Sequence, residues 1–181
     1  FKGTYQNNQA SKDGGAIYND GTEDYNKKHA VLNLSDLTFA DNVASDKGGA
    51  IYNGADATIN MSGVNTFVNN IANKGANDIY NDGALNITGG TTLIGGGIAG
   101  NGILTLADGA TLDIANTTVK QSEININGTV ALSILSNRSY GRLIADDGKL
   151  NVSDTAKLQL SVGGVGEYNI FDGNLAGFKN I

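Results

Sequence analysis

The 181-residue chain contains no cysteine, no proline and no tryptophan, and it has only one histidine. Without cysteine there is no disulfide framework, no thiolate metal ligand and no cysteine nucleophile. One histidine is too few for the usual two- or three-histidine metal sites, so we expect no metal and no cofactor. The net charge of −6 and the pI near 4.5 argue against nucleic acid and anionic membranes as partners, because both are bound through clustered Lys and Arg.

Long hydrophobic runs are also missing. No stretch approaches the roughly 20 apolar residues of a membrane span, so we expect no direct membrane insertion of this segment. The chain starts at Phe1 with neither an initiator Met nor a signal-peptide pattern, and we expect it to be a piece of a longer protein. Gly and Asn are abundant instead, with 26 and 24 copies. A hydrophobic fraction of 40% with 17% charged residues still predicts a packed core.

Three motifs recur along the chain. The first reads Thr-aromatic-x-x-Asn-x-Ala and starts at Thr4, Thr38 and Thr66. The second is an Ile-Tyr-Asn block within 14–19, 48–53 and 76–81, preceded by Gly-Gly-Ala in the first two copies. The third alternates aliphatic and polar residues, and we align its copies at Leu32, Ile59, Leu85 and Leu112, which are 27, 26 and 27 residues apart. Later copies are aligned at a spacing of 26 residues, Ile124–Ile126 with Leu150–Val152 and Leu132–Ile134 with Leu158–Leu160.

The period decides between two β architectures. Apolar and polar residues alternate as in strands, and Asp-Gly or Asn-Gly dipeptides between them are also typical of antiparallel hairpins. A repeat of 26–27 residues instead favours a parallel solenoid, in which each coil stacks on the previous one. We therefore predict an all-β parallel β-helix of about seven coils of roughly 26–27 residues, with three strands in each coil and no substantial helix.

The same pattern predicts the organisation of the chain. We expect one solenoid over 1–181, with a motif-rich half over 1–83 and a Gly-, Asn- and Thr-rich stem half over 84–181. The longer spacing between the first two Gly-Gly blocks coincides with a polar stretch near 22–29, which we interpret as a loop inserted into a turn.

Side-chain directions follow from the repeats. The aliphatic residues of the Leu-Asn-Leu strands should face inward and their Asn residues outward. In the second motif Asp78 replaces Ala16 and Ala50, so we expect this position to face outward with the tyrosine two residues on. Three isoleucines, Ile17, Ile51 and Ile79, would then stack inside. Three asparagines could form an internal amide ladder at a corner: Asn8, Asn42 and Asn70.

The paired motifs resemble the repeats of chlamydial polymorphic membrane proteins and related autotransporter adhesins. The matching positions are Gly14–Ile17, Gly48–Ile51, Phe39-x-x-Asn42 and Phe67-x-x-Asn70. The resemblance covers roughly residues 1–83, and the remainder looks like the stem of an autotransporter passenger. It implies a right-handed parallel β-helix that is exported across a Gram-negative envelope and displayed at the cell surface, outer-membrane-anchored or secreted.

Parallel β-helices also carry polysaccharide lyases and hydrolases, so we searched for paired carboxylates with a nearby cation. The candidates are Asp146 and Asp147 near Arg142 and Lys149, and Asp108 with Asp113. Since Asp147 precedes Gly148, we interpret the first pair as turn residues. The Gly-rich segment 95–102 lacks the strand-turn-helix context of a nucleotide site and the carboxylates of a calcium site, and we predict a wide turn there. Six Asn-x-Ser/Thr triplets are interpreted as strand chemistry rather than glycosylation signals: Asn33, Asn60, Asn86, Asn116, Asn137 and Asn151.

Two groups of residues are candidates for binding. An outward row of Tyr18, Tyr52 and Tyr80, about 4.8 Å apart, offers contact area for sugars or proteins, or packs beneath the inserted loop. The inserted stretch is a recognition loop or a solvated excursion, with these candidate residues: Tyr25, Lys27, Lys28 and His29.

We therefore hypothesise a non-catalytic segment of a surface-displayed adhesin. It would act in adhesion or self-association through its repeated outer faces, with a surface protein or glycan of a host or neighbouring cell as partner. A β-helical polysaccharide lyase or hydrolase and a structural stalk or filament unit are the alternatives.

Overall fold

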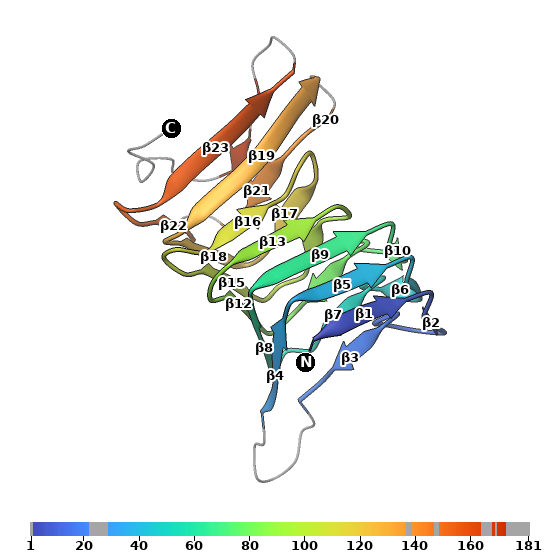
Figure 1. The fold of residues 1–181 in the computed structure, drawn as a ribbon. Coiled ribbons are helices and arrows are strands. Elements are labelled where there is room, and N and C mark those ends of the chain that lie inside the picture. Colours follow the sequence, from blue (N-terminus) through green and yellow to red (C-terminus); the bar gives the residue numbers. More distant parts are fainter. Residues whose placement is uncertain are drawn as a thin grey trace.

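The computed structural model describes residues 2–21, 29–136, 139–146, 149–163, 168 and 170–172. The described part of the chain contains no helix and forms 24 strands, which lie in four sheets wound around a common core (Figure 1). The coils rise from the N-terminal strands at one end of the rod to β23 at the other. The described strand pairs are all parallel except β19 with β20.

Each sheet gathers equivalent strands from successive coils. Sheet A contains β1 (Gly3–Gln6), β5 (Leu37–Ala40), β9 (Val64–Val68), β13 (Thr91–Ile94), β16 (Thr111–Asp113), β19 (Thr129–Ser136), β20 (Ser139–Tyr140) and β23 (Lys157–Val162). Sheet B contains β2 (Gln9–Ala10), β6 (Val43–Lys47) and β10 (Ile71–Lys74). Sheet C contains β3 (Ile17–Asn19), β7 (Ile51–Asn53), β11 (Ile79–Asn81), β14 (Ile98–Ala99), β17 (Thr118–Lys120), β21 (Arg142–Ile144) and β24 (Phe171–Asp172). Sheet D contains β4 (Ala30–Ser35), β8 (Ala57–Ser62), β12 (Ala84–Ile87), β15 (Ile103–Leu106), β18 (Glu123–Ile126) and β22 (Leu150–Val152).

The predicted parallel β-helix is confirmed, but its coils are not uniform. The first three coils have four strands each, because sheet B adds a short strand between sheets A and C. From coil four onward sheet B ends, and the chain crosses from β13 to β14 through three glycines, 95–97. In sheet D, Asn60 and Asn86 pair at the expected period, but the next partners of Asn86 are Thr105 and then Asn125, each reached through a much shorter stretch of chain. The prediction of one uniform period is therefore wrong for the two middle coils.

Two of the predicted alignments are corrected by this shortening. Leu112 does not stack on Leu85 in sheet D; it lies in sheet A and pairs with Thr92 and Val130. Leu132 pairs with Leu160, one alternation further along β23, and not with Leu158. Moving a strand by two residues leaves the same side chains facing inward, so hydrophobic alternation does not distinguish the two registers.

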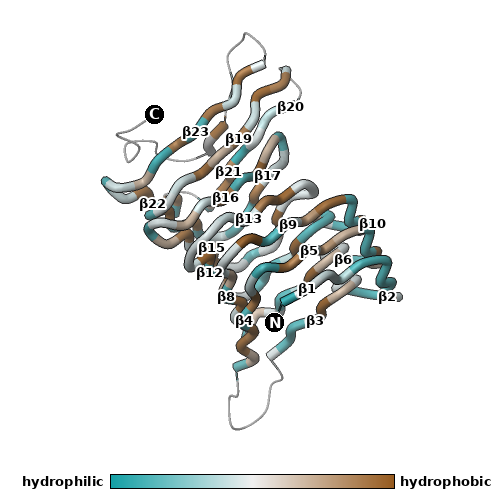
Figure 2. Tube along the Cα trace, viewed as in Figure 1, coloured by the Kyte–Doolittle hydropathy of each residue, from teal (hydrophilic) through white to brown (hydrophobic). Residues whose placement is uncertain are grey.

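The core is a column of aliphatic side chains stacked in register, and hydrophobic segments recur on each coil along the rod (Figure 2). In sheet D the predicted directions are confirmed, because Ile59, Met61 and Leu85 are fully buried while the intervening Asn side chains are not. In sheet A the core begins with an aromatic stack. The Tyr5 and Phe39 rings lie 5.3 Å apart and the Phe39 and Phe67 rings 4.7 Å apart, measured between centroids.

The Gly-Gly pairs lie in a turn where the backbones of successive coils come close together. Gly48 has φ +64°, a conformation that glycine adopts without strain. Its neighbour Gly49 lies against the next coil, where an added Cβ would come 2.3 Å from the carbonyl oxygen of Asn77. The sequence repeats glycine here because the backbone of one coil leaves no room for a side chain on the other.

The predicted corner ladder of asparagines is confirmed. The Nδ2 of Asn8 donates to the Oδ1 of Asn42 at 2.8 Å, and the Nδ2 of Asn42 donates to the Oδ1 of Asn70 at 2.9 Å. Asn42 and Asn70 are buried and also bond backbone groups of neighbouring coils. Each ladder residue follows a residue with φ near +55°, which turns the chain from sheet A into sheet B: Asn7, Asp41 and Asn69.

The predicted outward direction of Asp78 is wrong. Asp78 is fully buried, as is Ala50, the equivalent residue one coil earlier. Both precede the strand and lie in a bend, so strand alternation does not apply to them. The Asp78 carboxylate accepts from Asn70 Nδ2 at 2.9 Å and from the Gly96 amide at 2.6 Å. It therefore closes the corner ladder at the coil where sheet B ends.

The adjacent Asn77 closes sheet B itself. Asn77 stands where the first two copies have their second glycine, and its Oδ1 accepts a bond from the Ala72 amide in β10. No fourth strand pairs with β10 in the described part of the chain, so the side chain of Asn77 has room beside β10. The change from Gly-Ala to Asn-Asp in the third copy thus terminates both the sheet and the ladder.

A second buried ladder was not anticipated. The Asn that ends each Ile-Tyr-Asn block donates its Nδ2 to the Oδ1 of its counterpart in the next coil. The distance is 2.8 Å from Asn19 to Asn53 and 2.7 Å from Asn53 to Asn81. Asn81 then donates to the Oε1 of Gln121, two coils further on, at 2.6 Å. The recurrence of this Asn beside a buried Ile in three copies was the available signal.

Candidate functional site

The predicted tyrosine row exists on the outer face of sheet C. Tyr18, Tyr52 and Tyr80 are in register in β3, β7 and β11. Their rings are nearly parallel, with centroids 5.0 Å apart for the first pair and 6.0 Å apart for the second. In such a stack the inner ring faces cover one another, so Tyr52 presents its edge and hydroxyl group to solvent.

The two ends of this row differ. Tyr18 is 56% exposed and its hydroxyl donates to the Asp20 carboxylate at 2.9 Å, which raises the pKa of Tyr18 above its usual value. Tyr80 is covered by Gly75, and the Lys47 ammonium lies 4.4 Å from its ring centroid. A sugar ring could therefore stack on a free ring face at Tyr18 but not along the whole row.

Of the inserted stretch, only His29 lies within the described residues. It is exposed, and its Nδ1 lies 3.2 Å from the carbonyl oxygen of Asp56 in the next coil. The other predicted loop residues, Tyr25, Lys27 and Lys28, lie outside the described residues. Thus the structure brings the three row tyrosines together and leaves the loop candidates untested.

A row of amides runs along the outer face of sheet D. Asn33, Asn60 and Asn86 are in register. The Nδ2 of Asn60 donates to the Oδ1 of Asn33 at 2.8 Å, and the Nδ2 of Asn86 donates to the Oδ1 of Asn60 at 2.9 Å. Thr105 takes the next position, after which Asn125 and Asn151 continue with a bond of 2.8 Å. A hollow of about 460 Å³ lies beside this last pair. The predicted outward direction of these asparagines is confirmed, and their repeated amides offer both donors and acceptors.

Sheet A carries rows of threonine on its outer face. Thr4, Thr38 and Thr66 are in register in the first three coils. A second set, Thr91, Thr111 and Thr129, is in register in the next three. Val68 and Leu93 are exposed nearby and border an apolar hollow of about 220 Å³. The outer face of sheet A thus carries threonine and exposed aliphatic side chains, among them Leu93, Leu135 and Leu160.

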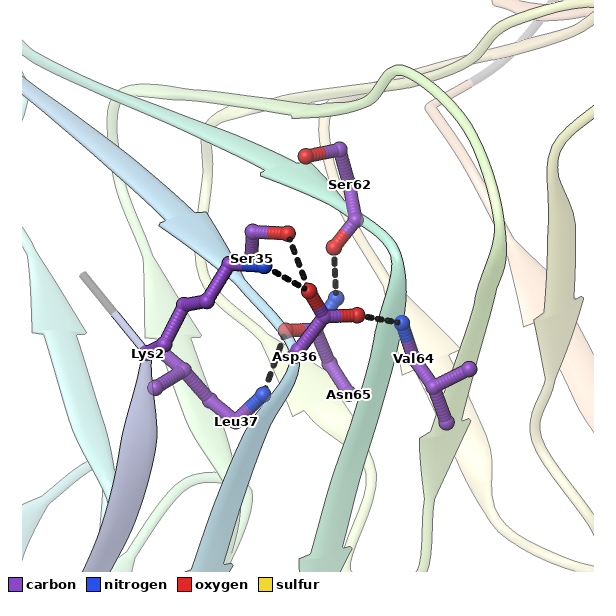
Figure 3. A network of polar contacts seen from close by, with 7 residues as sticks. All are labelled: Lys2, Ser35, Asp36, Leu37, Ser62, Val64 and Asn65. Atoms are coloured by element: carbon purple, nitrogen blue, oxygen red, sulfur yellow. Dashed lines mark hydrogen bonds and ion pairs between the residues drawn. The ribbon is translucent and has the colours of Figure 1, made fainter.

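A cluster of polar contacts lies at the turn between β4 and β5 (Figure 3). The Asp36 carboxylate pairs with the Lys2 ammonium at 2.9 Å and accepts from the Val64 amide at 3.0 Å and the Ser35 hydroxyl at 3.0 Å. The bond to Lys2 and these further donors lower the pKa of Asp36 to about 2. Beneath it, buried Asn65 ties the Leu37 amide to the Ser62 carbonyl. This cluster holds together the corner between sheets D and A in the first coils.

A hollow that sequence reasoning missed lies where sheet B ends. It has a volume of about 380 Å³ and is lined by Gly75, Ala76, Gly96, Ile98, Ala99, Thr118 and Lys120. Ala99 pairs with Tyr80 in sheet C and so takes the next position in the tyrosine row. Since the chain between Tyr80 and Ala99 is much shorter than that between Tyr52 and Tyr80, no repeat in the sequence connected them.

Two of the carboxylates that were considered for catalysis accept hydrogen bonds from nearby backbone amides. Asp108 accepts from the Gly109 amide and Asp113 from the Ala115 amide. Asp146 is exposed, and its carbonyl oxygen accepts from the Lys149 amide. Asp147 lies outside the described residues. The backbone bond from Lys149 to Asp146 agrees with the predicted turn there, and the side chains of Asp108 and Asp113 each bond a nearby backbone amide.

Within the described ranges, no group of three or more His, Cys, Asp or Glu side chains could hold a metal ion. No helix in the same ranges is long and apolar enough to cross a membrane.

In a comparison with family profiles, residues 6–20 and 36–54 match the Chlamydia polymorphic membrane protein repeat. These segments contain β2 and β3 in the first coil and β5, β6 and β7 in the second. They include the ladder asparagines Asn8 and Asn42 and both Gly-Gly turns. No curated protein and no solved structure matches the chain. The predicted resemblance is thereby confirmed for these segments, which carry the repeat in the first two coils of a parallel β-helix.

Proposed function

We propose that this β-helix, which carries the Chlamydia polymorphic membrane protein repeat, is a non-catalytic adhesive segment of a surface-displayed autotransporter passenger. The repeat family is one of surface or outer-membrane proteins of Gram-negative bacteria, and it is non-enzymatic. The segment would bind a surface protein or glycan of a host or neighbouring cell, or another copy of itself.

One observation carries the proposal: neutral polar side chains run in register along two outer faces. The amides on sheet D are in register in coils one to three and again in coils five and six, and the threonine hydroxyls on sheet A form two sets of three coils. Such rows favour many identical weak contacts over a single deep site. Seven coils about 4.8 Å apart and strands of about five residues give a sheet face on the order of 500 Å².

The size of that face predicts how it would bind. A stable interface buries roughly 800 Å² on each partner, so one face of this segment would bind weakly. Many copies displayed on one cell would bind together, and avidity would raise the overall strength by orders of magnitude. We therefore expect adhesion that depends on display density and is weak for the isolated chain.

Beads coated with the chain test the proposal, with clumping and binding to cultured epithelial cells as readouts. Thr66→Lys with Thr111→Lys places charge on the outer face of sheet A, and Asn60→Lys with Asn86→Lys does so on sheet D. Neither pair removes a core side chain, and circular dichroism checks the fold of each. We expect one pair to abolish clumping or binding while the other retains it. Coated beads that neither clump nor bind better than bare beads would contradict the proposal.

A further inference from the structure

We infer that the hollow beside Ala99 is a binding site for an acidic sugar of the uronic-acid class. The inference deepens the proposed adhesive function and rests on it for biological context, but the binding is a property of the isolated chain. It concerns a different surface from the amide and threonine rows.

The hollow is created by two changes at the same coil. Sheet B ends after β10, and the crossing through 95–97 removes the strand that would have continued it. In sheet C the row of three tyrosines is followed by Ala99, whose side chain is too small to continue the stack. The loss of a strand and of a ring at adjoining positions leaves a space of about 380 Å³, within the size range of small-ligand sites.

The polar groups at this hollow have no other role in the described structure. Lys120 is exposed and makes no ion pair with any described residue, and the Thr118 hydroxyl makes no hydrogen bond there. Lys120 is the only charged residue lining the hollow. Of the other described hollows, that on the Asn row has no charged lining residue and two on sheet A are lined by Asp113. Among these described hollows, this site alone combines a free cation with an apolar floor.

An acidic pyranose matches this arrangement. Its carboxylate would pair with the Lys120 ammonium, and its hydroxyl groups would bond to Thr118 and to the exposed backbone at Gly75. The apolar C–H face of the ring would cover Ala76 and Ala99, which are partly exposed in the hollow. A neutral sugar lacks the group that the cation selects. With one charged contact and a protein of net charge −6, we expect a dissociation constant in the millimolar range.

The test uses the purified 181-residue chain and two probes that differ only in the carboxylate, methyl glucuronide and methyl glucoside. Binding is followed by NMR titration. Lys120→Met removes the cation while keeping most of the aliphatic stem, and Lys157→Met is its control at an exposed lysine in β23. Ala99→Tyr continues the tyrosine row into the hollow. Thermal unfolding of each variant confirms that it is folded.

We expect the glucuronide to bind, the glucoside to bind at least tenfold more weakly, and Lys120→Met to weaken the glucuronide about tenfold while Lys157→Met leaves it unchanged. Ala99→Tyr should abolish binding in a folded protein. Equal binding of the two probes, or equal effects of the two lysine substitutions, would overturn the inference. Clumping or adhesion of beads without glucuronide binding would refute this site and leave the adhesive function standing. Glucuronide binding without clumping or adhesion would support this site and refute the proposed adhesive function.

Discussion

Replacing Asp78 by Asn should destabilise the protein, although it removes a buried acid. The two oxygens of Asp78 face only donors, the Nδ2 of Asn70 and the amide of Gly96. An Asn side chain has one acceptor, so its NH₂ group must oppose one of these donors. The neighbouring amide does not relieve the conflict by flipping, because the Oδ1 of Asn70 already accepts from the backbone and side chain of Asn42.

Because one buried donor loses its acceptor, the free energy of unfolding should fall by about 1–3 kcal/mol. For a chain of this length that corresponds to about 2–4 °C in Tm for each kcal/mol. If burial alone mattered, Asp78→Asn would instead increase the free energy of unfolding, because burial raises the pKa of Asp78 and disfavours its charged form. The two arguments are thus separated by the direction of the change.

Urea unfolding at pH 7 measures the effect, with Asp56→Asn as the matched control. Asp56 is exposed and its side chain caps no ladder, so that variant should stay within about 0.5 kcal/mol of the parent. If Asp78→Asn is as stable as the parent or more stable, the ladder-closing role is refuted.

The pH dependence gives a second check on the same residue. Because burial raises its pKa, folded Asp78 holds its proton more tightly than unfolded Asp, whose pKa is about 3.9. The parent therefore loses stability as pH rises from about 4 through the folded pKa, and Asp78→Asn has no such titration. The amount by which the unfolding free energy of the parent exceeds that of Asp78→Asn should be largest below pH 4 and smaller at pH 7. A difference that grows with pH would contradict this.

Three further substitutions test the scaffold. Gly49→Ala should cost about 3 kcal/mol, because its Cβ would meet backbone of the next coil, whereas Gly89→Ala has open space and should be nearly neutral in the same urea experiment. Asn53→Ala removes a buried amide with four ladder and backbone partners and should cost about 3 kcal/mol of unfolding free energy. Asn60→Ala, on the surface, should cost less than about 1 kcal/mol. Equal costs would refute the distinction between the buried and the surface ladder. Asp36, whose pKa of about 2 lies below the unfolded value near 3.9, should contribute stability above pH 4 that is lost as pH falls toward 2; an NMR titration of its carboxyl that gives an unshifted pKa would contradict the Lys2 contact.

The corner ladder and the tyrosine row could be predicted because their residues recur at the same register in three coils. Asn8, Asn42 and Asn70 repeat with the motif that bends the chain, so stacking alone places their amides in contact. What the rings of the row offer could not be predicted. Whether Tyr52 exposes a face or an edge depends on ring orientation, which packing between coils decides.

By itself the sequence determined that the chain is a parallel solenoid, which side chains of the Leu-Asn-Leu and Ile-Tyr-Asn strands face inward, and where the first three coils stack. Alternation and repetition carry that information, because each strand must bury one face and each coil must match the next. Only the tertiary structure decided the shortening of the middle coils, the burial of Asp78 and the hollow beside Ala99. A shift of two residues leaves the hydrophobic pattern unchanged, and residues in bends are not subject to alternation, so the register there is fixed by contacts between coils.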